Sequence, residues 1–223
     1  MAAFDYDQYL RRSWDSFTGN PARARASLAA LDGRKVARVL DVGCGAGQEM
    51  IPFVVEPGAF GVGVDIAPAS ARIGLELFAR HFPAARVVFV RAAAEALPIP
   101  SLSCDLVICR VALPYMDNRQ ALAEMSRVLG PQGMMLLKIH HAWHYWRVLK
   151  RAATTFDTSD MMYALRAFAA GTVYHATGSQ PTGKEVFETR WLLTRELARH
   201  ELSIRGEMPD SNPTVPSYII SRR

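Results

Sequence analysis

The sequence predicts an α/β fold, with helices around a mostly parallel sheet of seven strands, an antiparallel last strand and an inserted helical cap. From about Val36 onward, short β-branched runs alternate with helical patterns, which is typical of a parallel sheet with crossover helices. Near the end of the sequence, two strand-like runs are separated only by the turn "PDSNP". Two strands joined without a helix pair antiparallel, so the sheet is expected to be mixed at that edge.

The first five predicted strands are nearly continuous apolar runs, as expected of strands covered on both faces. They are Val36–Asp41, Phe60–Asp65, Arg86–Val90, Asp105–Arg110 and Met134–Ile139. Helical patterns with one apolar side lie between or after them. The predicted helices are Ser70–Phe82, Arg119–Leu129 and Glu188–His200, and the last two strands are Leu202–Gly206 and Ser217–Ser221.

The length of 223 residues, half of them apolar, predicts one domain over 1–223. Residues 1–34 are predicted to form an N-terminal helical segment, with Tyr6–Ala30 as one or two helices broken near Gly19-Asn20-Pro21. Residues 141–186 are too long for a structureless loop and are predicted to be an inserted cap. One cap helix is expected over Ser159–Gly171, with Ser159 as its N-cap and Gly171 past its end, after another around Trp143–Arg151.

Charge and cysteines narrow the class of protein. The formal net charge is +5 but the arginines are scattered, which favours a solvated basic surface over nucleic-acid binding. Cys44, Cys104 and Cys109 lie in or beside predicted strands, which suits small buried hydrophobes. No run of about 18 apolar residues occurs, and we expect a cytoplasmic protein. The Trp-rich, basic stretch 143–151 could contact a membrane surface.

The stretch "VLDVGCGAGQEM" places three glycines directly after the first predicted strand. A dinucleotide-binding fingerprint would need glycine at position 48, where Gln48 stands, and the Gly-Lys-Ser/Thr of a P-loop is absent. Asp65 ends the next strand, where an acid can accept hydrogen bonds from ribose hydroxyls. A mononucleoside without phosphates is therefore the predicted ligand, and Asp41 would favour a cationic group on it.

These motifs resemble the class I S-adenosyl-L-methionine (SAM)-dependent methyltransferases, and within them the type 11 branch that includes the ubiquinone and menaquinone biosynthesis enzymes. The resemblance covers Val39 to about Ile139 and rests on four motifs in order: "VLDVGCGAG", "GVGVDIA", "AEALPIPSLSCDLVICRVALPYMDN" and "RVLGPQGMMLLKIH". It implies a Rossmann-like, seven-stranded mixed sheet, SAM as cofactor and S-adenosyl-L-homocysteine (SAH) as product.

The resemblance also implies roles for particular residues. The methionine part of SAM would be held by Asp41 and the backbone of Gly43, Cys44, Gly45 and Gly47; the ribose by Asp65; and the adenine by Ile66, Ala94 and Glu95. Arg110 would lie beside the methionine part and the acceptor, or anchor an acidic acceptor. Relatives often have Asp where Ala93 stands, and quinone-pathway relatives have a His-His pair where this chain has Pro114-Tyr115, which argues against transferring their acceptor.

The predicted function is metal-independent methylation of a small molecule, which the cap aromatics suggest is aromatic or lipid-like. Methyl transfer needs alignment first, and a base only for some acceptors. Candidate bases are His140, His141 and Tyr115, with His144 and His175 in the cap. A non-catalytic SAM-binding regulatory module, an NAD-dependent oxidoreductase and a nucleic-acid methyltransferase remain alternatives. For the last, the typical Asn/Asp-Pro-Pro-aromatic motif is missing after the fourth strand, since "ALPY" comes several residues later.

Overall fold

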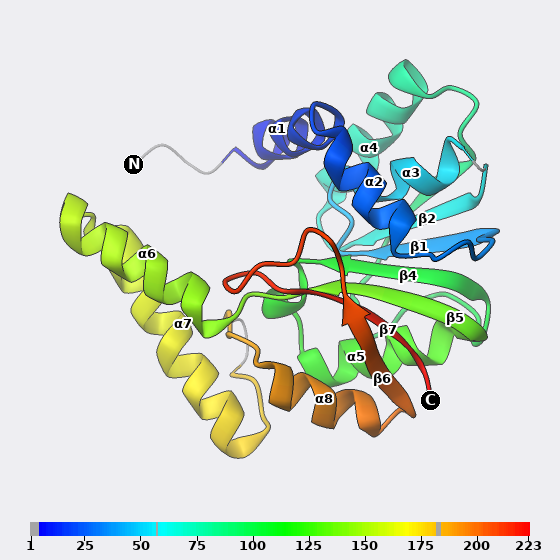
Figure 1. Cartoon of the computed structure of the whole chain (residues 1–223). Helices are drawn as coiled ribbons and strands as arrows, with labels where there is room; N and C mark the ends of the chain where they lie inside the picture. Colours follow the sequence, from blue (N-terminus) through cyan, green and yellow to red (C-terminus); the bar gives the residue numbers. More distant parts are fainter. Residues whose placement is uncertain (1–4, 57, 182–183) are drawn as a thin grey trace.

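The computed structural model describes residues 5–56, 58–181 and 184–223. Seven strands form one sheet in the order β3-β2-β1-β4-β5-β7-β6 (Figure 1). Neighbours from β3 to β5 pair in parallel, whereas β7 pairs antiparallel with both β5 and β6. The mixed sheet predicted from the sequence is confirmed. Its strands are β1 (Arg38–Val42), β2 (Phe60–Asp65), β3 (Val87–Arg91), β4 (Cys104–Arg110), β5 (Leu129–Lys138), β6 (Leu202–Glu207) and β7 (Ser217–Arg222).

Helices cover both faces of the sheet (Figure 1). In β4, Leu106 and Ile108 belong to the apolar cluster on one face, and Val107 and Cys109 belong to the cluster on the other. This double burial explains why the central strands are continuous apolar runs. The first face carries α1 (Tyr6–Thr18), α2 (Pro21–Ala29), α3 (Ile51–Val54) and α4 (Pro68–His81); the second carries α5 (Asn118–Val128) and α8 (Arg190–Ala198).

The strand order indicates where on the sheet a ligand can bind. It reverses between β1 and β4, because β2 and β3 lie to one side of β1 while β4 and β5 lie to the other. Ligands of open α/β sheets bind at this switch point, beyond the carboxyl ends of the strands. The segments that follow β1, β2, β4 and β5 therefore form the candidate site.

Two helices, α6 (Ala142–Thr155) and α7 (Thr158–Thr177), form a hairpin that projects from this edge (Figure 1). Both cap helices were predicted, but the bounds of the second were wrong. Asp157, not Ser159, is the N-cap of α7, and the helix continues to Gly178, which caps it in the left-handed conformation. Gly171 lies inside the helix, where a Cβ atom would come 2.3 Å from the Phe187 ring. The small size of Gly171 thus allows the Phe187 ring to pack against α7. Residues 182–183 of the predicted cap lie outside the described part.

A buried carboxyl group joins the chain after the hairpin to α5. Oε2 of Glu188 accepts a hydrogen bond from Nδ2 of Asn118 (2.9 Å), and its Oε1 accepts one from the Thr189 amide (3.1 Å). Burial raises the pKa of Glu188 to about 8, although the bond from Asn118 opposes the shift. The folded protein therefore keeps a proton that the unfolded chain loses above about pH 4.3.

Glu188→Gln is expected to change how stability depends on pH. Between about pH 4.5 and pH 8 the unfolded state releases this proton and the native state keeps it, so the wild-type protein loses stability as pH rises through that window. Glutamine has the shape of the neutral acid and does not titrate. The melting temperature of the variant should rise relative to wild type from pH 5 to pH 8. Glu56→Gln, at an exposed position, is the control and should give a constant difference.

Candidate functional site

The glycine loop follows β1 and is shaped by three residues in the left-handed region. Gly43, Gly45 and Gly47 have φ of +69°, +54° and +78°. A Cβ atom on Gly43 would also lie 2.4 Å from the Cβ of Ala112, in the segment after β4. The amides of Gly43 and Cys44 donate to the Val64 carbonyl of β2 at 2.8 and 3.1 Å. The loop therefore requires glycine both for its backbone conformation and, at Gly43, for its close approach to the segment after β4.

Gly43→Ala is expected to lower the free energy of unfolding by about 2 kcal/mol or more, because backbone strain adds to the contact with Ala112. Gly33→Ala is the matched control, since Gly33 has a φ of +75° and a Cβ atom at that position would meet nothing within 4 Å. It should lose only the backbone part, about 1 kcal/mol. Urea unfolding of both variants measures the difference. Equal losses would mean that the loop moves away from Ala112 without cost.

Asp65 ends β2 and holds the loop directly. Its Oδ2 accepts a hydrogen bond from the Gly45 amide, and its Oδ1 accepts one from the Ala67 amide, both at 2.9 Å. Ile66, the next residue, is 69% exposed. Asp65 thus lies against the glycine loop, and the roles of Asp65 toward ribose and of Ile66 toward adenine stay predictions.

Asp41, the last acid of β1, is buried, and its Oδ2 has no hydrogen-bond partner among the described residues. Burial raises the pKa of Asp41 well above its usual range, and the nearby carboxylates of Glu49 and Asp65 add to this. A buried carboxylate is stable only if it is protonated or paired with a cation. The site is therefore suited to a ligand that brings a positive charge or a hydrogen-bond donor.

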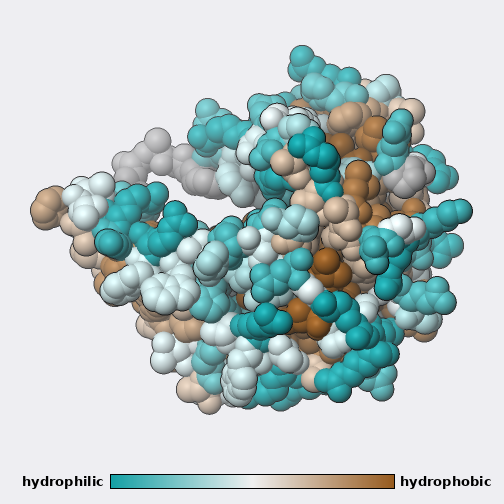
Figure 2. All heavy atoms as spheres, in the orientation of Figure 1, coloured by the Kyte–Doolittle hydropathy of each residue, from teal (hydrophilic) through white to brown (hydrophobic). Residues whose placement is uncertain are grey.

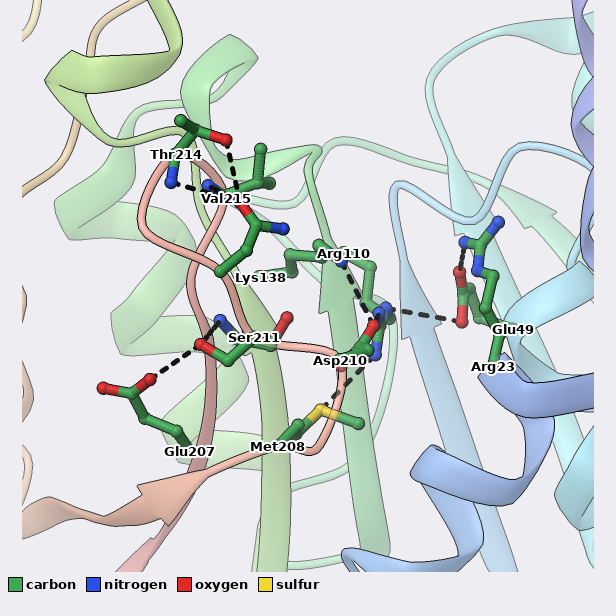
Figure 3. A network of polar contacts seen from close by, with 12 residues as sticks. Arg23, Glu49, Arg110, Lys138, Glu207, Met208, Asp210, Ser211, Thr214 and Val215 are labelled. Carbon is green, nitrogen blue, oxygen red and sulfur yellow. Dashed lines mark hydrogen bonds and ion pairs between the residues drawn. The ribbon is translucent and has the colours of Figure 1, made fainter.

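A network of charged side chains links Arg110 to Glu49 and Asp210 (Figure 3). The Arg110 guanidinium at the end of β4 pairs with Asp210 of the β6–β7 loop, and its Nε lies 3.4 Å from Oε2 of Glu49. Lys138 Nζ is 3.1 Å from the same Asp210 carboxylate, and Arg23 of α2 pairs with Glu49. Burial raises the pKa of Asp210, but Arg110 and Lys138 outweigh it, so the net shift is downward. Asp210 therefore stays ionised.

Two buried carboxylate oxygens here, Asp41 Oδ2 and Asp210 Oδ1, have no hydrogen-bond partner among the described residues, whereas Glu49 Oε2 and Arg110 Nε face each other at 3.4 Å. Unsatisfied buried groups are rare in folded proteins, and a cluster of them indicates a place that a ligand or water occupies. The prediction for Arg110 stays a prediction. Its guanidinium lies at the expected strand end, but carboxylates of the chain itself surround it.

The remaining predicted cofactor residues lie around the same edge. Ala94 is buried, and Glu95 accepts a hydrogen bond from the Asp117 amide (2.7 Å), which ties the segment after β3 to the start of α5. Cys44 is also buried, and burial raises the pKa of its thiol well above the usual range, with Asp41 adding to the effect. A thiol that stays protonated suits packing, as the sequence indicated, rather than nucleophilic chemistry.

A second polar cluster lies where β5 ends and the hairpin begins. Nδ1 of His140 is 3.4 Å from Oε1 of Glu185, and the hydroxyls of Tyr145 and Tyr163 donate to the same oxygen at 2.6 and 2.8 Å. Burial raises the pKa of Glu185, but the bonds from His140, Tyr145 and Tyr163 outweigh it, so the net shift is downward. Glu185 is thus an ionised carboxylate among one imidazole and two phenols.

Sequence reasoning missed Glu185. Glu185 is the one acidic residue in the aromatic stretch 161–187, and a single acid among aromatic residues could have marked it as a candidate site residue. The segment is fixed against the sheet edge, because the Val186 amide donates to the Pro114 carbonyl (3.4 Å) and the Glu188 amide to the His140 carbonyl (2.9 Å). Irregular backbone thus brings a distant acid to the end of β5.

The structure separates the two predicted histidine bases. His141 is the N-cap of α6, with Nδ1 accepting from the Trp143 amide at 3.4 Å. Burial lowers its pKa, and His175 adds to this. The third predicted candidate, Tyr115, has an exposed ring, but burial of its phenol and the Glu185 carboxylate raise its pKa. Of the two histidines, His140 is the one beside the Glu185 carboxylate.

The other cap histidines are held by packing. The His144 ring stacks on His140 with ring centroids 4.1 Å apart, and burial together with His140 lowers the pKa of His144 to about 4. His175 lies on α7, with Nε2 3.0 Å from the Thr189 hydroxyl and its ring stacked on Phe187. Neither is placed beside Glu185 as His140 is.

Comparison with protein families gives one match, to the "Methyltransferase domain" model, over residues 40–137. An uncharacterized methyltransferase, YcgJ of Bacillus subtilis, is 37% identical over 109 residues, covering 47% of this chain and 41% of the relative. The ubiquinone/menaquinone biosynthesis C-methyltransferase UbiE of Hahella chejuensis is 34% identical over 131 residues, covering 57% of this chain and 49% of the relative. The chain thus spans less than half the length of either relative.

Among solved structures, magnesium protoporphyrin IX methyltransferase from Synechocystis, with bound SAH, superposes with a TM-score of 0.65. The two are 16% identical, and the match covers 100% of this chain and 90% of that one. At this identity the likeness shows the fold, including the strands that carry the glycine loop and Asp65.

Proposed function

We propose that the protein transfers a methyl group from SAM to a small aromatic or lipid-like acceptor, a proposal supported by the match of residues 40–137 to the methyltransferase domain. The observation that carries the proposal is the His140–Glu185 pair at the end of β5, on the same sheet edge as the glycine loop. A base at this place suits an acceptor that must lose a proton. We therefore propose a hydroxyl group as the methyl acceptor.

The residues around the glycine loop fit SAM. Asp41 is buried and its Oδ2 has no hydrogen-bond partner among the described residues, and the amino group of the cofactor is a cation that suits such a place. Asp65 carries the carboxylate expected to bind the ribose hydroxyls. Bound SAM supplies an electrophilic methyl group, so the protein's task is to align the acceptor and exclude water, which contributes about 7–11 kcal/mol in favourable cases.

At the acceptor end, His140 is proposed as the base. A proton on Nδ1 would face Glu185, leaving Nε2 free to take the acceptor's proton. Bound SAM would supply the methyl group to the acceptor oxygen, and the electron pair of the broken carbon–sulfur bond would stay on the sulfur of the product. Glu185 stabilises the resulting imidazolium, and Tyr145 and Tyr163 hold Glu185 in place through their hydrogen bonds.

The acceptor class is supported by the aromatic surroundings. Tyr145 contacts Phe168 at 6.3 Å between ring centroids and Tyr163 at 5.9 Å, and Tyr115 is exposed next to them. Aromatic rings with a few polar atoms are typical of sites for small apolar molecules. The names of the relatives agree, since UbiE acts in quinone biosynthesis and the structural neighbour methylates a porphyrin. We propose that the α6–α7 hairpin caps the acceptor.

Incubation with methyl-labelled SAM and the small-molecule, nucleic-acid and protein fractions of a cell extract tests the proposal. Label should enter an apolar, solvent-extractable small molecule and should be stable to conditions that hydrolyse esters if the acceptor is a phenol or alcohol. Label in the nucleic-acid fraction would overturn the acceptor class. Binding of SAM with no label in any fraction would favour the non-catalytic regulatory module.

A further inference from the structure

One face of α6 carries tryptophans and basic residues together. Trp143 and Trp146 are three residues apart, and Arg147 and Lys150 each lie four residues after one of them, so all four lie on the same side of the helix. Trp143 is 56% exposed and Trp146 50% exposed. The opposite side packs on α7 through the buried Tyr145. An exposed face of this composition is typical of helices that lie on a lipid surface.

A basic groove runs along the same helix. It has a volume of about 840 Å³ and lies between α6 and the loop 212–215. Its charged lining is basic throughout, and Lys150 has no ion-pair partner among the described residues. Figure 2 shows a group of hydrophilic side chains on the projecting hairpin, beside pale and hydrophobic ones. The lining residues are His144, Arg147, Val148, Lys150, Arg151, Thr154, Asn212, Pro213, Thr214 and Val215.

Charge indicates what fits this face. The whole of α6 carries three basic and no acidic residues. One of the three positive charges is paired, because Arg151 forms an ion pair with Asp160 of α7. Arg147 donates a hydrogen bond to the neutral Thr214 hydroxyl at 3.3 Å and keeps its charge unpaired in that contact. Within the described part of the chain no helix is long and apolar enough to cross a bilayer. Any membrane contact of these residues would therefore be at the surface.

We propose that α6 and the basic groove dock the protein on an anionic lipid surface. Lipid phosphates would occupy the groove beside Arg147 and Lys150, and the indoles of Trp143 and Trp146 would lie at the level of the headgroups. The hairpin follows β5 directly, so docking would bring the His140 end of the site close to the lipid. The inference goes beyond the proposed methylation and does not depend on turnover.

Flotation of the purified protein with vesicles tests the proposal. Phosphatidylcholine vesicles containing about 30% phosphatidylserine should bind the wild-type protein at low salt, whereas pure phosphatidylcholine should bind much less. The double variant Arg147→Gln/Lys150→Gln should lose about thirtyfold in partitioning, from the loss of two charges. Arg25→Gln/Arg80→Gln removes two exposed charges from α2 and α4 and should bind as wild type.

The aromatic part has its own test. Trp143→Ser/Trp146→Ser should remove the binding that persists at about 0.5 M salt, where charge attraction is screened. Trp191→Ser, at a residue 64% exposed on α8, is the matched control. Equal binding of the α6 variants and their controls would overturn the proposal. So would inhibition of vesicle binding by millimolar inorganic phosphate with no lipid preference, or a higher affinity for RNA than for the anionic vesicles.

Discussion

Asp65→Ala is expected to abolish the thermal stabilisation that SAH gives the wild-type protein. At about 100 times its dissociation constant, a ligand of the native state stabilises by about 2.7 kcal/mol, which for a domain of this size raises the melting temperature by roughly 5–10 °C. The variant loses the carboxylate proposed to bind the ribose. It also loses the two hydrogen bonds that this carboxylate accepts from the backbone amides of Gly45 and Ala67. Differential scanning fluorimetry measures both proteins with and without SAH.

Asp105→Ala provides a closely matched control. Asp105 also accepts two backbone hydrogen bonds, from the amides of Ala37 and Arg38, both at 2.9 Å, but at the opposite end of the strands. It should lower the melting temperature by a similar amount and leave the SAH shift intact. NAD should stabilise neither protein. A shift with NAD in place of SAH would reject the assignment of the ligand.

His140→Asn is expected to lower the rate of methyl transfer to a hydroxyl acceptor by about 10²–10⁴ with little change in SAH affinity. Glu185→Gln should lower the rate by a smaller factor, because the imidazole remains but loses the carboxylate at 3.4 Å. Glu185 is ionised at neutral pH, since its pKa is shifted down, so its loss should also move the pH profile of the rate. Single-turnover kinetics from pH 6 to pH 9 give both quantities.

His141→Asn distinguishes this prediction from the alternative histidine. Asn is a good N-cap residue, so the variant should keep α6 and the rate of the wild-type protein. If His141→Asn is inactive and His140→Asn is not, the base is assigned to the wrong histidine. If both keep the wild-type rate across the pH range, no histidine base operates, and an amine, a thiolate or a pre-ionised acceptor becomes the better hypothesis.

Local pattern predicted most of the fold. Apolar runs located the first five strands, and two strand-like runs around a turn located the last two. The break near Gly19-Asn20-Pro21 is the junction of α1 and α2, where Asn20 accepts a hydrogen bond from the Ala22 amide. The motif resemblance to SAM-dependent methyltransferases is confirmed by the family match and by the relatives. Gly171 misled because glycine usually follows a helix, whereas here a ring from Phe187 requires the space.

Some residues of the candidate site could likewise be predicted from the sequence, and others could not. The glycine loop and Asp65 come from adjacent strands with a fixed spacing, so the sequence placed them together. Glu185 and Asp210 come from irregular segments 45 and 100 residues away from His140 and Arg110, their partners. Neither segment has a periodicity that reveals its direction. Tertiary contacts decide where such side chains lie, and only the structure shows them.

The place of β7 has a consequence for how the molecule assembles. β7 comes last of the seven strands in the sequence, yet it lies between β5 and β6. During synthesis from the N-terminus, β1 to β5 can pair as they emerge, but β6 has no neighbour until β7 is made. The sheet edge that carries the glycine loop can thus form early. Asp210, on the loop between β6 and β7, reaches Arg110 only when β6 and β7 have joined the sheet. Until then, Glu49 is the carboxylate of this network that can pair with Arg110.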